Sequence, residues 1–324
     1  MYFSRIRVKP NIQELSHLHH LLRNNSYGVH QLLWDLMPRV KQDCKDDAQR
    51  EFLFREEIAR EQLPHYKGAR GEPLYYVLSQ NEPSKENPLL AVESKLYEPK
   101  IEAADRFSFK LRANPVQTLK EARQSNEIES WHKKREQLGF KAKNATKKRI
   151  RHDVVMAAQS SLLRELSGYT KTEVTGKKSD LKKSVYATWI TTGNEMVTSR
   201  LKESLQQNER YREFLEQHLS SPKLFDLAFK ATMDLSLEKW LTEKGEEKGF
   251  KVVRDDKRKC LRFQAEGYRW NALPQKSRTA GFSSVDFEGV IEVTNPRTFV
   301  DECLFKGIGP AKGFGCGLMM VKRV

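Results

Sequence analysis

Cysteine is scarce in this sequence of 324 residues, and the few that occur stand far apart. The four are Cys44, Cys260, Cys303 and Cys316, and none belongs to a Cys-x-x-Cys pair. A structural zinc site or a disulfide framework depends on closer spacing, so we expect neither. Reduced thiols are typical of the cytoplasm, which is where the sequence predicts the protein to reside.

Long apolar runs are missing as well. No stretch approaches the roughly 20 apolar residues that a membrane-spanning helix needs. The first residues, Met1 to Val8, alternate as a short strand does, and they lack the charged head and apolar centre of a secretory signal. We therefore expect neither a membrane span nor a signal peptide.

The nucleotide-binding motifs that contain glycine are absent from the glycine-rich stretch 306–320. No window has the Walker A form, which is Gly, four residues, then Gly-Lys-Ser/Thr. The dinucleotide-binding motif Gly-x-Gly-x-x-Gly is absent too, because Lys312 occupies the position of the third glycine after Gly307 and Gly309. No carboxylate cluster suggests a two-metal nuclease, so we expect a metal-free site and no cofactor.

What the sequence has in excess is positive charge. The 58 Lys and Arg exceed the 43 Asp and Glu, which gives a net charge of +15. This balance points to an acidic partner, either nucleic acid or an anionic membrane surface. The basic residues spread over several segments instead of one amphipathic helix, which favours nucleic acid. One basic run, 141–151, is explained equally by a solvated linker or by a phosphate contact.

Five glycines surround a single lysine near the C-terminus, between a predicted helix over 296–305 and a predicted strand over 318–324. The residues are Gly307, Gly309, Lys312, Gly313, Gly315 and Gly317. Such a loop can be a tight connection between helix and strand. It can also present consecutive backbone N–H groups to a polyanion. The spacing alone leaves both interpretations open.

The first predicted helix begins near Ser26, a candidate N-cap, and ends before Pro38. Its apolar stripe, spaced for burial on one face, consists of Val29, Leu32, Leu33 and Leu36. Tyr27, His30 and Trp34 lie on the neighbouring face, which places His30 at the rim of the stripe. By spacing alone, His30 is either a packed structural residue or a titratable group with access to solvent.

Alternating residues predict strands at 2–8, 50–55, 74–78 and 107–111, with 89–104 left unassigned. With the first helix, this order approximates the β-α-β-β-α-β plan of a ferredoxin-like domain. From 153 to 245 the composition is helical, without obvious strands. Strand signals return at 250–254, 260–265, 268–270 and 284–293, and a polar loop over 274–281 carries Lys276 and Arg278. For this pair, ordinary solvated charge is the simple explanation.

Four stretches together resemble the CasE (Cse-type) family of CRISPR RNA-processing endoribonucleases. They are Tyr27-Gly-Val-His30, Phe109-Lys-Leu-Arg-Ala-Asn-Pro115, Asp286-Phe-Glu-Gly-Val290 and Gly307-Ile-Gly-Pro-Ala-Lys-Gly-Phe-Gly-Cys-Gly-Leu318. Their order and placement agree with that family, over about 1–158 and 233–324. The helical block between these ranges departs from the compact family pattern, so its role lies outside the resemblance.

The resemblance implies an α+β fold with two ferredoxin-like lobes, RRM-related and of the RAMP type. The expected division is an N-terminal lobe over 1–120, then a connecting segment and the start of the second lobe over 121–159. A helical insertion over 160–232 and a C-terminal lobe with the glycine loop over 233–324 complete it. The implied partners are the CRISPR repeat RNA hairpin and a backbone subunit of the Cascade complex, with target DNA met only through that complex.

The resemblance also implies roles for individual residues. His30 matches the catalytic histidine and Tyr27 its helper tyrosine, while the 274–281 loop falls where the family places a basic hairpin in the RNA groove. The predicted RNA-binding residues are Lys276, Arg278, Lys110, Arg112, Gly307, Gly309, Lys312, Gly313 and Gly315.

The expected reaction needs no metal, because RNA carries its own nucleophile in the 2′-hydroxyl. Attack on the adjacent phosphate leaves a 2′,3′-cyclic phosphate and a 5′-hydroxyl, and a histidine can move the proton as acid or as base. One hypothesis competes with this function, and another adds a role for the helical block. The chain could be a non-catalytic subunit that holds processed RNA, and the 160–232 block could dock another protein.

Overall fold

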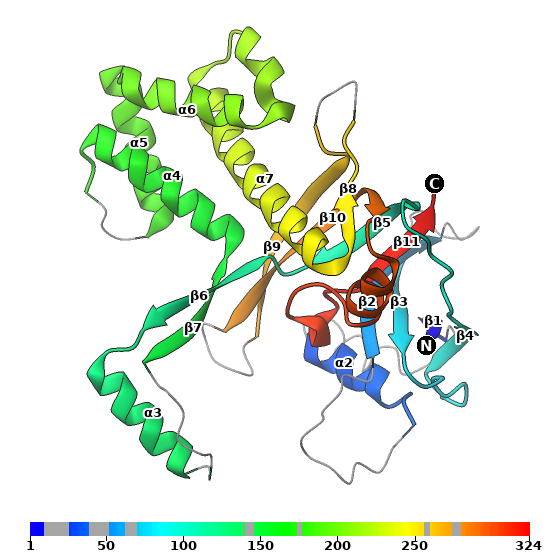
Figure 1. Cartoon of the computed structure of the whole chain (residues 1–324). Helices are drawn as coiled ribbons and strands as arrows, with labels where there is room; N and C mark the ends of the chain where they lie inside the picture. Colours follow the sequence, from blue (N-terminus) through cyan, green and yellow to red (C-terminus); the bar gives the residue numbers. More distant parts are fainter. Residues whose placement is uncertain are drawn as a thin grey trace. The chain divides into compact units, whose positions relative to one another are not determined.

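The computed structural model describes residues 1–9, 26–38, 52–61, 70–137, 139, 146–173, 177–255, 260–273 and 280–324. They form two compact units, the first from Met1–Asn114 and Lys239–Val324, the second from Pro115–Glu238. The ribbon is shown in Figure 1. No helix within these ranges combines the length and the apolar character that crossing a membrane requires. The mixed helix and strand content confirms the expected α+β class.

The N-terminal sheet of the first unit has four antiparallel strands in the order β2-β3-β1-β4. The strands are β1 (Tyr2–Val8), β2 (Phe52–Glu61), β3 (Arg70–Ser79) and β4 (Leu90–Leu96). Helix α2 (Ser26–Trp34) lies between β1 and β2 in the chain. This is the ferredoxin-like order, except that the connection from β3 to β4 contains no helix.

The fourth strand of this sheet differs from the prediction. The sequence pattern assigned it to 107–111, whereas it is formed by β4, inside the segment left unassigned. In β4 only Leu90 is fully buried, and Glu93, Ser94 and Lys95 follow one another at its centre. This strand lies at an edge of the sheet, where little of it needs apolar residues, so its alternation is weak.

The apolar stripe of α2 packs against the sheet as expected. Val29, Leu33 and Leu36 are at most 3% exposed and belong to one cluster with Phe52 and Phe54 of β2. Leu32 is partly buried against the same cluster. The stripe fixes the rotation of α2 about its axis and therefore the direction in which His30 projects.

The second sheet of the same unit has the order β11-β5-β10-β8, with β9 also pairing with β10. Its strands are β5 (Arg106–Ala113), β8 (Phe250–Val252), β9 (Phe263–Ala272), β10 (Gly281–Val293) and β11 (Met319–Arg323). Alternate residues of β5, from Phe107 to Ala113, are buried, which leaves Lys110 and Arg112 on the other face. The strand predicted at 107–111 therefore exists but belongs to this sheet.

Two helical segments complete a second ferredoxin-like order. The end of α7 (Ser221–Lys248) comes between β5 and β8, where Trp240 stacks on Phe287 of β10 with ring centroids 5.6 Å apart. The predicted helix over 296–305 consists of α8 (Pro296–Thr298) and the π-helical η2 (Phe299–Phe305), between β10 and β11. The second compact unit is inserted in the chain after β5.

Strand β9 corrects a second prediction. The pattern indicated separate strands at 260–265 and 268–270, but the structure has one strand with a register shift opposite Ser284 and Asp286. Gly267 stands at this irregularity with φ of +66°, a backbone angle that residues with a Cβ rarely adopt. A glycine inside a strand pattern marked a bulge instead of a strand end.

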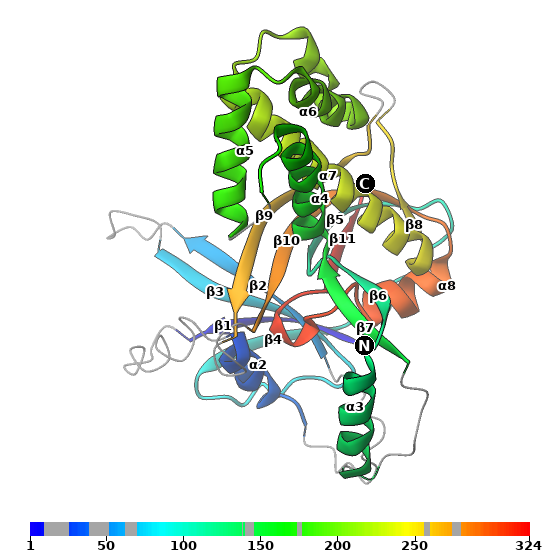
Figure 2. The ribbon, with the colours of Figure 1, turned by 90° about the vertical axis from the view of Figure 1, so that its left-hand side faces the viewer.

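The second unit contains a two-stranded ribbon and a helical block. The ribbon consists of β6 (Val116–Ala122) and β7 (Lys147–Asp153), joined through helix α3 (Ser125–Gln137). The block contains α4 (Val154–Thr170), α5 (Lys178–Thr192), α6 (Glu195–Gln207), the 3-10 helix η1 (Glu209–Glu216) and the first part of α7. Figure 2 shows α3 beyond the end of the ribbon and the block at its other end.

The helical character predicted for 153–245 is confirmed, and the block has its own core. Trp189, Leu201 and Phe225 are among its buried residues. The ribbon was not predicted, because seven of the fourteen residues of β6 and β7 are charged and obscure the alternation. The domain ranges expected from the sequence stay a prediction.

Candidate active site

His30 projects from α2 into an aromatic surround. Its ring stacks on Phe52 with centroids 5.2 Å apart, and it lies 5.7 Å from Trp34 and 6.3 Å from Phe54. Phe52 and Phe54 come from β2, so two neighbouring elements hold the imidazole. The side chain is half-buried, at the rim of the apolar stripe where the helical spacing placed it.

Burial lowers the pKa of His30 below its usual value of 6.5. Desolvation is the cause, because removal from water disfavours the charged imidazolium. The neutral imidazole therefore predominates at neutral pH, and a neutral imidazole can accept a proton.

The glycine-rich loop comes up to the imidazole at Gly313. A Cβ placed on Gly313 would lie 3.5 Å from His30 Cδ2 and 3.6 Å from Nε2, at ordinary contact distance. Gly313 is in η3 (Lys312–Phe314), a 3-10 turn, and it does not have a positive φ. Helix α2 and the C-terminal loop, which are distant in the sequence, thus meet at His30.

Four other glycines of the loop are explained by backbone conformation and close packing, and the predicted role of three of them in RNA binding stays a prediction. Gly307 has φ of +73°, and a Cβ there would lie 2.8 Å from the Gly317 carbonyl oxygen. Gly309, Gly315 and Gly317 also have positive φ. The tight-connection interpretation accounts for these four glycines, while Gly313 is the one whose missing side chain leaves space beside His30.

Lys312 is bound to its own loop. Its Nζ donates a hydrogen bond to the Lys306 carbonyl oxygen at the end of the preceding helix. A cation there suits the partial negative charge of a helix C-terminus. The described contacts of this lysine stabilise the loop, and its predicted role in RNA binding stays a prediction.

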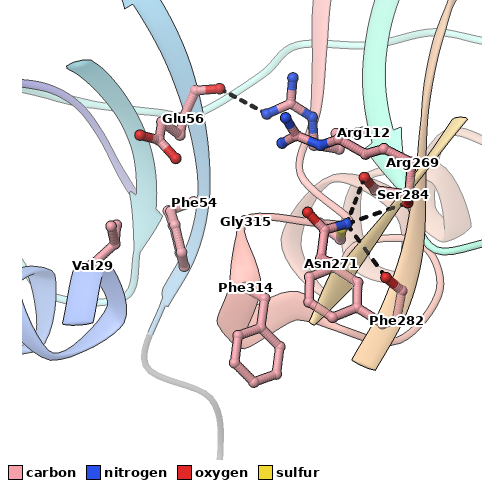
Figure 3. Close-up of a pocket in the computed structure, with 11 residues that line it drawn as sticks. Val29, Phe54, Glu56, Arg112, Arg269, Asn271, Phe282, Ser284, Phe314 and Gly315 are labelled. Carbon is pink, nitrogen blue, oxygen red and sulfur yellow. Dashed lines mark hydrogen bonds between the residues drawn. The ribbon is translucent and has the colours of Figure 1, made fainter. Parts of the chain in front are cut away.

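A small cavity of about 30 Å³ lies next to this meeting point. It is lined by Val29, Phe54, Glu56, Arg112, Arg269, Asn271, Phe282, Ser284, Phe314, Gly315 and Cys316. Figure 3 shows Glu56, Arg112 and Arg269 at one end and Phe314 at the other. His30 itself does not line this cavity, but Phe54 does, and its ring centroid lies 6.3 Å from that of the imidazole.

Arg112 joins the two sheets of the first unit. Its Nε and Nη2 donate to the two carboxylate oxygens of Asp286, each at 2.9 Å, and its Nη1 donates to the Glu56 carbonyl oxygen at 3.0 Å. Arg55 of β2, which is 3% exposed, lies 3.4 Å from the same carboxylate. Asp286 therefore holds arginines from both sheets, and Arg112 positions the walls of the cavity.

The remaining predicted residues are placed differently. Lys110 pairs with Glu288 at 3.1 Å on the open face of the second sheet, where both side chains are about half exposed. Tyr27 lies in α2 one turn before His30, but its side chain is outside the described part. Lys276 and Arg278 also fall outside the described residues.

Four polar residues of the cavity were not predicted from the sequence, namely Glu56, Arg269, Asn271 and Ser284. Burial raises the pKa of the Glu56 carboxyl, an effect that Arg112 and Arg269 oppose. Within the described ranges no carboxylate forms an ion pair with Arg269, whose side chain is exposed. The only available signal was the alternation of Tyr268, Arg269 and Trp270, which identified the strand but not the direction of the arginine.

No three His, Cys, Asp or Glu side chains in the described ranges are grouped as metal ligands would be.

Comparisons with known proteins agree on one family. The model of the family described as "CRISPR associated protein" matches residues 1–323. Among solved structures, CRISPR endoribonuclease Cse3 bound to a 19-nucleotide RNA has a TM-score of 0.50 and 16% identity, over 99% of this chain and 100% of that chain. Thermus thermophilus Cse3 bound to an RNA representing a pre-cleavage complex has a TM-score of 0.50 and 17% identity, over 99% and 98%. No curated protein matches the sequence.

Proposed function

The chain belongs to the CRISPR-associated protein family, and we propose that it is an endoribonuclease that cleaves CRISPR repeat RNA. The single observation that carries this proposal is His30, half-buried among aromatic rings and facing Gly313 beside a cavity that arginines line. The likeness in fold to Cse3, an endoribonuclease found bound to RNA, supports it.

In the proposed reaction His30 moves the proton. Its neutral imidazole accepts the proton of the RNA 2′-hydroxyl, whose oxygen attacks the adjacent phosphorus as the bond to the 5′ oxygen breaks. The departing 5′ oxygen takes up a proton, from water or from the imidazolium, so the products are a 2′,3′-cyclic phosphate and a 5′-hydroxyl. A positioned histidine of this kind contributes about 10²- to 10⁴-fold to a rate.

The negative charge that develops on the phosphate needs a cation. Arg269 is the described candidate, because its exposed guanidinium lines the cavity and forms no ion pair within the described ranges. From the sequence, Lys312 and the glycine loop remain candidates for this role, and Tyr27 remains a candidate for orienting the 2′-hydroxyl. After cleavage we expect the chain to hold the RNA hairpin within a Cascade complex in the cytoplasm.

The test is cleavage of the repeat RNA in EDTA by the wild-type protein and by His30→Ala. We expect the wild type to cut at one position and leave a cyclic phosphate, and the variant to bind the RNA but cut at least about 100-fold more slowly. An RNA with a 2′-deoxy sugar at the cleaved position is the matched control and should resist both proteins.

Three outcomes would contradict the proposal. Cleavage by His30→Ala at the wild-type rate would show that His30 does not move the proton. Loss of wild-type cleavage in EDTA would point to a metal-dependent reaction. If both proteins bind the RNA and neither cuts it, the chain is a non-catalytic RNA-binding subunit.

A further inference from the structure

The β6–β7 ribbon of the second unit carries its charges on two different sides. In an antiparallel ribbon, residues that face each other project to the same side, and successive residues project to opposite sides. Thr118 faces Arg151, and Ala122 faces Lys147, with Lys120 between them on β6. One side of the ribbon therefore presents Lys120, Lys147 and Arg151, and its single acidic residue, Asp153 at the end of β7, accepts a hydrogen bond from Met156 N as the N-cap of α4. We call these three residues the basic face.

The opposite side of the ribbon contains Glu121, and the charged residues there have partners. Glu121 lies 3.3 Å from His152 Nε2, and Lys148 Nζ lies 2.7 Å from Glu127 of α3. Trp131 of α3 contacts the guanidinium groups of Arg123 and Arg135, which lie 4.7 and 4.9 Å from its ring centroid. The charges on this side are thus paired within the second unit.

The basic face remains open. Lys120, Lys147 and Arg151 are all exposed, and in the part of the chain that the structure describes none of them lies within ion-pair distance of a carboxylate. Lys147 and Arg151 are four residues apart on one strand, a spacing of about 13 Å. Three cations spaced along the ribbon in this way suit the regularly spaced charges of a phosphodiester backbone.

From this one-sided distribution we propose that the basic face of the β6–β7 ribbon binds the phosphate backbone of a nucleic acid, as a contact separate from the His30 site. The net charge of +15 agrees with such a partner. A membrane surface is a poorer match, because the exposed apolar residue of the ribbon, Leu119, lies on the opposite side. The basic run at 141–151 was explained equally by a solvated linker or a phosphate contact. For 147–151, which forms most of β7, the proposal favours the phosphate contact.

The test compares two triple variants of the full chain. The first is Lys120→Ala, Lys147→Ala and Arg151→Ala. The matched control is Lys183→Ala, Lys202→Ala and Lys223→Ala, three exposed lysines of the helical block, so that both proteins lose the same net charge. Binding is measured between about 50 and 200 mM salt with a 20-nucleotide RNA of mixed sequence, its duplex, and DNA of the same sequences.

We expect the basic-face variant to bind about tenfold more weakly, with the slope of log affinity against log salt smaller by about 2. The control triple should bind as the wild type does. Loss on RNA alone identifies RNA as the ligand, and equal loss on DNA identifies a contact that ignores the sugar. Single variants Lys120→Gln and Arg151→Gln, each expected to lower the slope by about 1, keep the test valid if the triple variant misfolds.

Binding indistinguishable from that of the control triple would overturn the proposal. This is also the result expected if the partner of the basic face is an acidic protein. The outcome is independent of the cleavage test. If His30→Ala cut RNA at the wild-type rate while the basic-face variant lost affinity, the proposed function would fail and the backbone contact would stand.

Discussion

At the scale of single residues, the structure gives separate roles to His30 and to individual residues of the glycine loop. The imidazole owes its lowered pKa to burial, and the open space beside it to Gly313. Lys312, which the sequence predicts to bind RNA, donates a hydrogen bond from its ammonium group to the Lys306 carbonyl oxygen at a helix end. Arg269, which the sequence did not single out, lines the cavity with an exposed guanidinium.

The pH dependence of cleavage follows from the pKa of His30. A general base works only when neutral, so the single-turnover rate should rise with pH to a plateau, and the midpoint of the rise should lie below the usual 6.5. The reason for the low midpoint is the desolvation that disfavours the imidazolium. A rate that climbs only above pH 6.5, or that falls between pH 6.5 and 8, would show that His30 is not the base.

Two glycines of the same loop should respond differently to alanine. Gly307→Ala forces a positive φ on a residue with a Cβ and a 2.8 Å approach to the Gly317 carbonyl oxygen, so we expect a loss of unfolding free energy of about 1–3 kcal/mol. Gly313→Ala meets only ordinary contacts, so its thermal midpoint should stay near the wild-type value. Its methyl group occupies space beside the imidazole, and cleavage should slow.

Thermal unfolding and single-turnover cleavage of the two variants check this pair. A Gly313→Ala protein that is as active as the wild type would mean that the RNA does not enter the space between this glycine and His30.

At the scale of elements, the position of the cavity depends on how the two sheets of the first unit are joined. Helix α2 and strand β2 supply His30 and its aromatic surround, while η3, β9 and β10 supply the opposite wall. Asp286 on β10 holds Arg112 of β5 and Arg55 of β2. These charges connect three strands that local sequence patterns treat separately.

Removal of Arg112 should therefore cost stability as well as activity. Arg112→Ala leaves the carboxylate of Asp286 without its bidentate partner, and we expect a loss of about 1–3 kcal/mol in unfolding free energy. Lys110→Ala, two residues earlier on the same strand, removes an exposed pair and should cost less than about 1 kcal/mol. Denaturant unfolding of both variants, with Asp286→Ala to complete a double-mutant cycle for Arg112, measures the difference. Equal losses for the two would show that the buried contact adds nothing.

At the scale of the whole molecule, the second unit is an insertion in a ferredoxin-like lobe. The chain leaves the first unit at Asn114 and re-enters it at Lys239. Near Gly309, a Cβ would lie 3.3 Å from the Asn114 carbonyl oxygen and 3.5 Å from the Trp240 ring. The points of exit and return are thus close together, and the helical block has a core of its own.

Replacement of 116–236 by a short Gly/Ser linker should therefore leave the first unit folded. We expect this shortened chain to cut repeat RNA at saturating protein concentration, because the residues around His30 all belong to the first unit. Its affinity for RNA should fall, and its salt dependence should resemble that of the basic-face variant. Loss of cleavage in a chain that melts cooperatively would show that the second unit takes part in the reaction.

The sequence by itself determined the local features of this protein: the rotation of α2, the helical character of 153–245, the excess of positive charge and the four stretches that identify the family. Each depends on residue type and on spacing within a few turns of chain. Tertiary structure alone decided that Gly313 contacts His30, that Arg112 pairs with Asp286, and that β5 belongs to the second sheet. These contacts join distant segments, and their geometry follows from how whole sheets and helices pack, which no local period encodes.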